Sequence, residues 1–83
     1  MITREEVKDV VFTSVATTFG ISKENLEEGM DASDVEGWDS VSTSHLLLEV
    51  EERIGCELDI AAILEAENLG QMIDVIHPLL QAP

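Results

Sequence analysis

The sequence predicts an all-helical fold, a small four-helix bundle with a long first loop and a short third helix. Apolar residues recur at helical spacing in several segments, and capping residues precede those segments. No segment alternates convincingly between apolar and polar residues, as a half-buried strand would. The chain has 83 residues, of which 45% are hydrophobic, which is enough for one small core. Residues 1–83 are therefore expected to form a single domain.

The first helix is expected from Arg4 to Phe19. Thr3 and Glu6 have the spacing of a capping box, in which each side chain accepts a hydrogen bond from the other residue's backbone N–H. The apolar residues that then recur at helical spacing are Val7, Val10, Val11, Val15 and Phe19. Gly20 is a plausible end, because glycine readily adopts the left-handed conformation that terminates helices.

Residues 21–39 show no sustained periodicity and should form the long first loop. A loop of this length in so small a domain is more often functional than idle. The apolar residues expected to hold it against the core are Ile21, Leu26, Met30, Val35 and Trp38.

The second helix should begin near Ser40 and end at Gly55. On a helical wheel of about 100° per residue, one third of its circumference carries the stripe that faces the core. This stripe comprises Leu46, Leu47, Val50 and Ile54. Val41 and Leu48 lie on nearly the opposite face.

His45 and Glu52 flank this second apolar pair, Val41 and Leu48. Exposed apolar residues bordered by charge suggest a protein contact site. Scattered surface hydrophobes are also common, so the pair alone leaves both interpretations open.

Two shorter helices should follow. Asp59 can cap a third helix over residues 60–66, and Asn68 can cap a fourth, with Gln71 reaching back from its third position. Pro78 should end or kink the fourth helix, since proline has no backbone N–H to donate.

The net charge of the chain limits the classes of partner that it can bind. The chain has 18 acids and four bases, a formal net charge of −14. A field of that sign repels nucleic acids and anionic membranes, and it favours partners with basic patches. No apolar run approaches the roughly 20 residues of a membrane span, and Cys56 is the only cysteine, so an internal disulfide is impossible. We expect a cytoplasmic protein.

Four hydroxyl side chains gather at the start of the second helix: Ser40, Ser42, Thr43 and Ser44. Such residues, like Asp39 before them, often do no more than cap or begin a helix. A nucleophilic serine needs a base and an oxyanion hole. Only His45 and His77 could be that base, and the sequence around Ser40 is not a nucleophile elbow. We therefore expect no self-contained hydrolase chemistry.

No metal site is expected either. A calcium loop with Gly37 at its sixth position would need carboxylates where Ala32 and Thr43 stand. Cys56 and the two histidines lack the spacing of zinc ligands, and Cys56 is better explained as a half-buried packing residue.

Asp39-Ser40-Val41, followed by an acidic amphipathic helix that ends at an Ile-Gly turn, resembles the acyl carrier protein family. The likeness extends over nearly the whole chain, including the capped first helix, the acidic loop and the two last helices. In that family, the serine after the aspartate is esterified by 4'-phosphopantetheine, which a separate transferase takes from coenzyme A. The resemblance assigns that role to Ser40, with Asp39 as the flanking residue of the motif.

The resemblance also implies how the protein works. It would be a monomeric acyl carrier without catalytic activity of its own, and it would hold acyl groups as thioesters on the arm. Its partners would be a phosphopantetheinyl transferase and acyl-loading and acyl-processing enzymes with basic patches. The residues expected to contact partners are Val41, His45, Leu48 and Glu52. The residues expected to line an acyl pocket are Leu46, Leu47 and Val50.

The sequence departs from the pattern of many fatty-acid carriers at Val41, Ser42 and His45, which stand where those carriers have Leu and two acids. The acidic patch beside the arm is thus thinner. We expect a stand-alone carrier of a specialised, polyketide-type pathway, with fatty acid biosynthesis as the other possibility. An aminoacyl or peptidyl carrier and an unmodified acidic interaction module are the alternatives.

Overall fold

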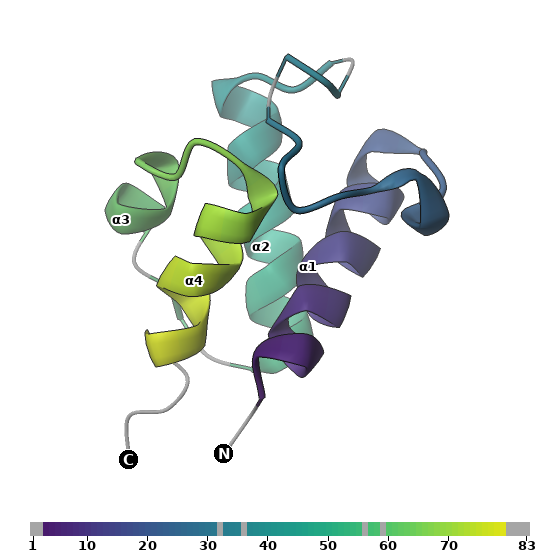
Figure 1. Ribbon diagram of the computed structural model, residues 1–83. Coiled ribbons are helices and arrows are strands. Elements are labelled where there is room, and N and C mark those ends of the chain that lie inside the picture. Colours follow the sequence, from purple (N-terminus) through teal and green to yellow (C-terminus); the bar gives the residue numbers. More distant parts are fainter. Residues whose placement is uncertain (1–2, 32, 36, 56, 59, 80–83) are drawn as a thin grey trace.

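The computed structural model describes residues 3–31, 33–35, 37–55, 57–58 and 60–79, except for the side chains of residues 40, 60, 62 and 79. All regular structure in these ranges is helical, which confirms the all-helical class (Figure 1). The elements are α1 (Arg4–Phe19), the 3-10 turn η1 (Lys23–Asn25), α2 (Ser40–Ile54), α3 (Ile60–Leu64) and α4 (Leu69–Leu79). The sequence did not predict η1, a single turn within the long loop.

The bounds of α1 are those predicted. The hydroxyl of Thr3 accepts a hydrogen bond from the N–H of Glu6 at 3.2 Å, and the Glu6 carboxylate accepts one from the N–H of Thr3 at 3.4 Å. Gly20 has a φ of 68° and donates its N–H to the carbonyl of Ala16 at 2.9 Å. The capping box and the left-handed glycine therefore fix both ends of the helix.

The five-residue α3 is shorter than predicted, because it ends at Leu64 rather than at Ala66. Asp59, the predicted cap, lies outside the described residues. The count of four helices in the predicted bundle thus depends on this short α3. Figure 1 shows α3 beside α2 and α4, and it packs against both.

The start of α4 matches the prediction with one difference. The N–H of Gln71 donates to the side-chain oxygen of Asn68 at 2.8 Å, so Asn68 is the cap. The Gln71 side chain accepts from the N–H of Glu67 at 3.0 Å rather than from that of Asn68. Pro78 lies inside the helix, which continues to Leu79.

The core lies where α1, α2 and α4 meet. It is almost wholly aliphatic, as the scarcity of aromatic residues requires, and Phe12 is its buried aromatic side chain. The members are Val7, Val11, Phe12, Val15, Leu26, Leu46, Leu47, Val50, Leu58, Ile63, Leu69, Met72, Ile73 and Ile76. Burial of these side chains drives folding, because it removes apolar surface from water.

The long loop is held on the bundle as predicted. Leu26 and Val35 are buried, and Ile21, Met30 and Trp38 are partly buried and pack against the core.

The loop also supplies hydrogen-bond acceptors to the first turn of α4, whose N–H groups have no partner within the helix. The N–H of Leu69 donates to the carbonyl of Met30 at 2.9 Å, and that of Gly70 donates to the carbonyl of Glu28 at 2.7 Å. A Cβ at Gly70 would lie 3.2 Å from the same Glu28 oxygen, so the contact favours glycine. These bonds fix the loop relative to α4.

An ion-pair cluster links α1, the loop and α4. Arg4 binds Glu28 at 2.6 Å and Asp74 at 2.8 Å, and Lys8 lies 3.6 Å from Glu28. The Arg4 guanidinium hydrogen-bonds the Glu28 carboxylate and so lowers its pKa. The same contact with Glu28, together with Asp74, raises the pKa of Arg4. The other two bases of the chain are also paired, Lys23 with Asp9 and Arg53 with Glu49.

Candidate functional site

The start of α2 carries the motif that the sequence singled out. Ser40 is the first helical residue, and its side chain lies outside the described part of the structure. Asp39 is the N-cap, and its carboxylate accepts the N–H of Ser42 at 2.9 Å. That hydrogen bond lowers the pKa of Asp39, so the carboxylate is ionised at neutral pH. Gly37, Asp39 and Val41 are all exposed, so Ser40 lies in an accessible stretch of backbone.

Two neighbouring hydroxyls are engaged in internal hydrogen bonds. Ser42 donates its hydroxyl to the carbonyl of Gly37 at 2.8 Å. Thr43 is buried and donates its hydroxyl to the carbonyl of Asp39 at 2.9 Å. It also accepts the indole N–H of Trp38 at 2.6 Å. Both hydroxyls therefore brace the junction between the loop and α2.

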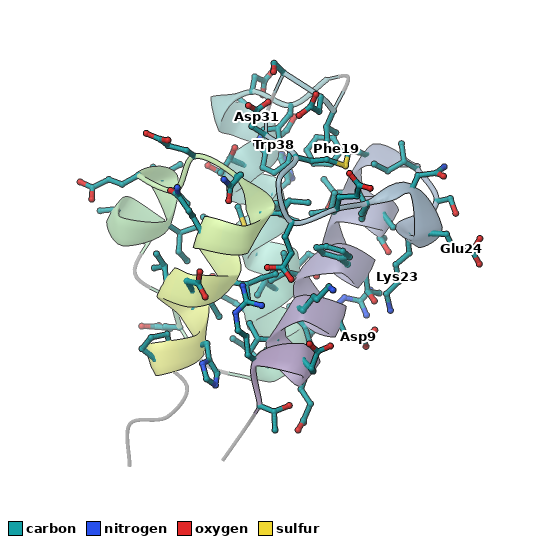
Figure 2. The ribbon with its side chains drawn as sticks, viewed as in Figure 1. Asp9, Phe19, Lys23, Glu24, Asp31 and Trp38 are labelled. Atoms are coloured by element: carbon teal, nitrogen blue, oxygen red, sulfur yellow. The ribbon has the colours of Figure 1, made fainter. Side chains whose placement is uncertain are left out.

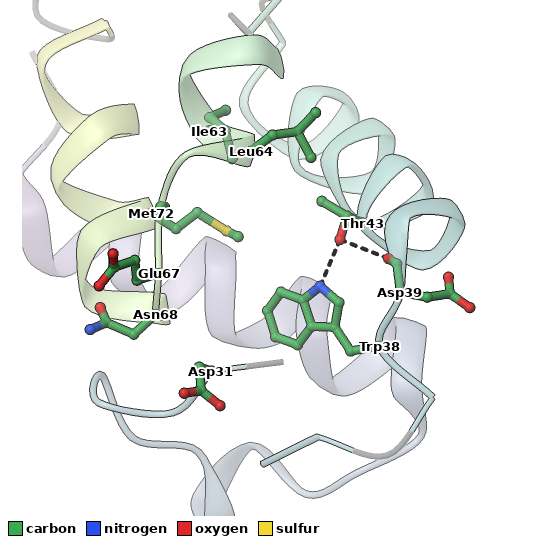
Figure 3. Close-up of a pocket in the computed structure, with 10 residues that line it drawn as sticks. Asp31, Trp38, Asp39, Thr43, Ile63, Leu64, Glu67, Asn68 and Met72 are labelled. Carbon is green, nitrogen blue, oxygen red and sulfur yellow. Dashed lines mark hydrogen bonds between the residues drawn. The ribbon is translucent and has the colours of Figure 1, made fainter. Parts of the chain in front are cut away.

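Beside this junction lies a cavity of about 340 Å³, between α2, α3, the start of α4 and the loop (Figure 3). Its apolar lining comes from Trp38, Ile63, Leu64, Ala66 and Met72. Its polar lining comes from Asp31, Asp39, Thr43, Glu67 and Asn68. In Figure 3 the indole of Trp38 and the side chains of Met72 and Leu64 border the same space. The cavity thus has an apolar lining bordered by polar residues, and in Figure 3 the carboxylates of Asp39 and Glu67 point away from it.

The predicted acyl-pocket residues lie elsewhere. Leu46, Leu47 and Val50 have no exposed surface and belong to the core, and none of them lines this cavity. Their assignment to an acyl pocket stays a prediction. No site role was predicted from the sequence for Trp38 or for Ile63. The position of the only tryptophan directly before Asp39 was the signal that could have pointed to the former.

The predicted partner face has the exposure that the helical wheel required. Val41 is 67% exposed and Leu48 is 57% exposed, although both are large apolar residues. His45, Leu48 and Glu52 line one open hollow, whose other lining residues include Glu49, Glu51 and Glu57. Leu64 of α3 is a further exposed apolar side chain that was not predicted, at 54%. The role of this face in partner binding remains a prediction.

Two other expectations concern metals and membranes. Among the residues that the structure describes, no three His, Cys, Asp or Glu side chains are grouped so that they could hold a metal ion. Cys56 falls outside those residues. None of the described helices is long and apolar enough to cross a bilayer.

Comparison with known proteins identifies the family. A family model described as a phosphopantetheine attachment site matches residues 9–76, an interval that includes Asp39, Ser40 and the whole of α2 and α3. The chain belongs to this family. It is also similar to an acyl carrier protein of Chloroherpeton thalassium, with 28% identity over 80 residues, which are 96% of each chain. The resemblance to acyl carrier proteins is thereby confirmed.

Membership establishes the cofactor and the class of the protein. The group is 4'-phosphopantetheine, and members of the family are carriers without catalytic activity of their own. Such a carrier implies a phosphopantetheinyl transferase that attaches the arm and enzymes that act on its cargo. The residues at the start of α2 fit the group, because a serine stands at the first helical position between exposed neighbours.

Proposed function

We propose that this chain is a single acyl carrier domain over residues 1–83, and that Ser40 bears the 4'-phosphopantetheine arm. One observation carries the proposal. The matched family interval contains an Asp-Ser pair, and its serine begins α2 directly after an exposed N-cap. We further propose that the protein is a four-helix bundle of the carrier type, in which the short α3 is one of the four helices. We also propose that it acts as a cytoplasmic monomer.

The proposed attachment is a phosphoryl transfer. The hydroxyl oxygen of Ser40 forms a bond to the phosphorus that bears pantetheine, and the pyrophosphate bond of coenzyme A breaks. Adenosine 3',5'-bisphosphate leaves, and the serine proton goes to a base of the transferase. The arm supplies a terminal thiol, to which acyl groups attach as thioesters.

The chain's own residues hold the attachment point in place. Asp39 caps α2, and Ser42 and Thr43 bind the backbone carbonyls of Gly37 and Asp39. These bonds fix the end of the loop against the first turn of α2. A fixed backbone between exposed neighbours supports recognition of Ser40 by a separate transferase, because less order must be gained on binding.

We propose that partner enzymes contact the exposed face of α2 through Val41, His45, Leu48 and Glu52. The acidic hollow around Leu48 supports a basic partner surface with an apolar centre. Because Ser42 and His45 stand where fatty-acid carriers have acids, a specialised polyketide-type pathway is favoured over general fatty acid synthesis.

Intact-mass measurement tests the attachment. Wild type, Ser40→Ala and Ser44→Ala are each incubated with coenzyme A and a broad-specificity phosphopantetheinyl transferase. Ser44→Ala is the matched control, since it removes another hydroxyl one turn further along α2. We expect wild type and Ser44→Ala to gain the mass of one arm and Ser40→Ala to gain none, with all three retaining helical circular dichroism.

A full gain by Ser40→Ala would place the arm on another residue. No gain by the wild type would instead support the unmodified interaction module.

A further inference from the structure

Trp38 lies at the junction between the long loop and α2, and it is held from two sides. Its indole N–H donates to the hydroxyl of Thr43 at 2.6 Å. Its ring stacks on Phe19, the last residue of α1, with centroids 5.2 Å apart and an angle of 24° between the planes. Figure 2 shows both rings at the end of the bundle where α2 begins. Trp38 therefore links the end of α1 to the first turn of α2.

The hydrogen bond of the indole spans the proposed attachment point. Trp38 stands before Ser40 in the sequence and Thr43 stands after it, so the bond joins the two sides of that residue. The Thr43 hydroxyl also donates to the backbone carbonyl of Asp39 at 2.9 Å, as Figure 3 shows. The chain on both sides of Ser40 is thereby tied to one hydroxyl, and Thr43 is buried.

The other side-chain hydrogen bonds described at this junction are local. Asp39 accepts the N–H of Ser42, and Ser42 donates its hydroxyl to the carbonyl of Gly37. Both bonds would survive a movement of the loop end and the start of α2 relative to α1. The stacking of Trp38 on Phe19 would not survive it, because Phe19 belongs to α1 and both rings pack against the core. Trp38 thus holds the junction in place relative to the bundle.

We propose that Trp38 is a positioning residue for the transfer of phosphopantetheine to Ser40. This role rests on the proposed function, which assigns the arm to Ser40. With the junction held by the indole, the transferase receives the backbone of Ser40 in one arrangement. A misplacement of about 1 Å can cost roughly 10²-fold in rate, because the reacting atoms must be aligned. Trp38 therefore acts on the chemical step, whereas the exposed face of α2 acts on binding.

Steady-state kinetics with coenzyme A and a broad-specificity phosphopantetheinyl transferase test this role. Trp38→Phe keeps a ring that can stack on Phe19 but removes the N–H donor. Thr43→Val keeps the shape of the side chain but removes the hydroxyl, and Thr43→Ser is the conservative variant that retains it. Ile73→Val, in the core on α4, is the control for a loss of stability away from the junction.

All proteins are assayed below their melting transitions. We expect Trp38→Phe and Thr43→Val to lower kcat roughly tenfold, with the KM for the carrier nearly unchanged. Thr43→Ser should recover most of the kcat, because its hydroxyl can still accept the indole N–H. Ile73→Val should lower the melting temperature and leave kcat as in the wild type. A tryptophan with a structural role alone would not change kcat at a constant KM.

The indole N–H provides a direct measurement of the contact. Trp38 is the only tryptophan of the chain, so its indole N–H gives a single proton resonance in the NMR spectrum. We expect this proton to exchange slowly with solvent in the wild type and in Thr43→Ser, and faster in Thr43→Val. Equal exchange rates in the three proteins would show that the Thr43 hydroxyl does not hold the indole.

Intact mass separates the two proposals. A wild type that gains no arm refutes the proposed function. If the wild type is modified on Ser40 but Trp38→Phe keeps its kcat, or changes KM alone, the role of Trp38 is wrong. It is equally wrong if Ile73→Val lowers kcat to the same extent. Should Thr43→Val not fold, Trp38→Phe decides the outcome, since it retains an aromatic ring at the junction.

Discussion

A comparison of Leu46→Ala with Leu48→Ala tests whether α2 has one buried and one exposed apolar face. The two leucines lie two residues apart on one helix, so the change in side chain and in helix propensity is the same. Leu46 has no exposed surface, whereas Leu48 is 57% exposed. Truncating a buried leucine costs about 2.7–5.0 kcal/mol, because a cavity remains. A surface substitution usually changes stability by about 0.5 kcal/mol or less.

These magnitudes can be set against the stability of the whole domain. At roughly 0.05–0.15 kcal/mol per residue, a chain of 83 residues is stabilised by about 4–12 kcal/mol. One kcal/mol shifts the melting temperature of such a domain by roughly 4–8 °C. Leu46→Ala should therefore lower the melting temperature by at least about 11 °C, and Leu48→Ala by less than about 4 °C.

Circular dichroism at 222 nm, the standard helical band, followed during heating and repeated in urea, measures both effects. Transfer of phosphopantetheine to each variant is then measured below its melting transition. We expect Leu48→Ala to lower kcat/KM for the transferase, because a central apolar contact can carry more than about 1 kcal/mol of binding. If Leu48→Ala melted as early as Leu46→Ala, the assignment of Leu48 to the exposed face would be wrong, and the partner face with it.

Two further predictions concern charge. Glu28→Gln should destabilise the protein at neutral pH, and the difference from wild type should shrink below about pH 4. The pKa of Glu28 is lowered in the folded state, so its stabilisation is present above the ordinary carboxyl range and is lost as pH falls through the lowered value. Melting curves across pH measure this, with Glu27→Gln as the control of equal charge, and parallel profiles for the two variants would contradict it. Sodium chloride should raise the melting temperature, because about 0.1 M salt screens repulsions beyond about 10 Å. A melting temperature that falls with salt would show that the loss of attraction in the screened ion pairs outweighs the loss of repulsion between acids.

Most of the fold could be predicted from the sequence, because the local signals in each segment agree with the structure that the segment adopts. The capping box of Thr3, the left-handed Gly20 and the cap at Asn68 act over a few residues, and all three are visible in the sequence. The apolar periodicity of α2 separated buried Leu46 from exposed Leu48 for the same reason. Each signal depends on residues that are neighbours along one helix.

The cavity was missed because its lining depends on contacts between distant segments. Trp38 comes from the loop, Ile63 from α3 and Met72 from α4, and no local pattern brings them together. The length of α3 was overestimated for a similar reason, since the last predicted turn is replaced by the approach to α4. The hydrogen bonds from α4 to the loop carbonyls could not be predicted from periodicity either.

The arrangement of the four bases connects the fold to the proposed function. Arg4 and Lys8 hold the loop acid Glu28 against α1, and Lys23 pairs with Asp9 near η1. Arg53 pairs with Glu49 toward the C-terminal end of α2. None of these ion pairs involves a residue at the start of α2, so no base neutralises the carboxylate of Asp39 there. A basic enzyme drawn to this acidic molecule would therefore meet an ionised carboxylate directly before Ser40.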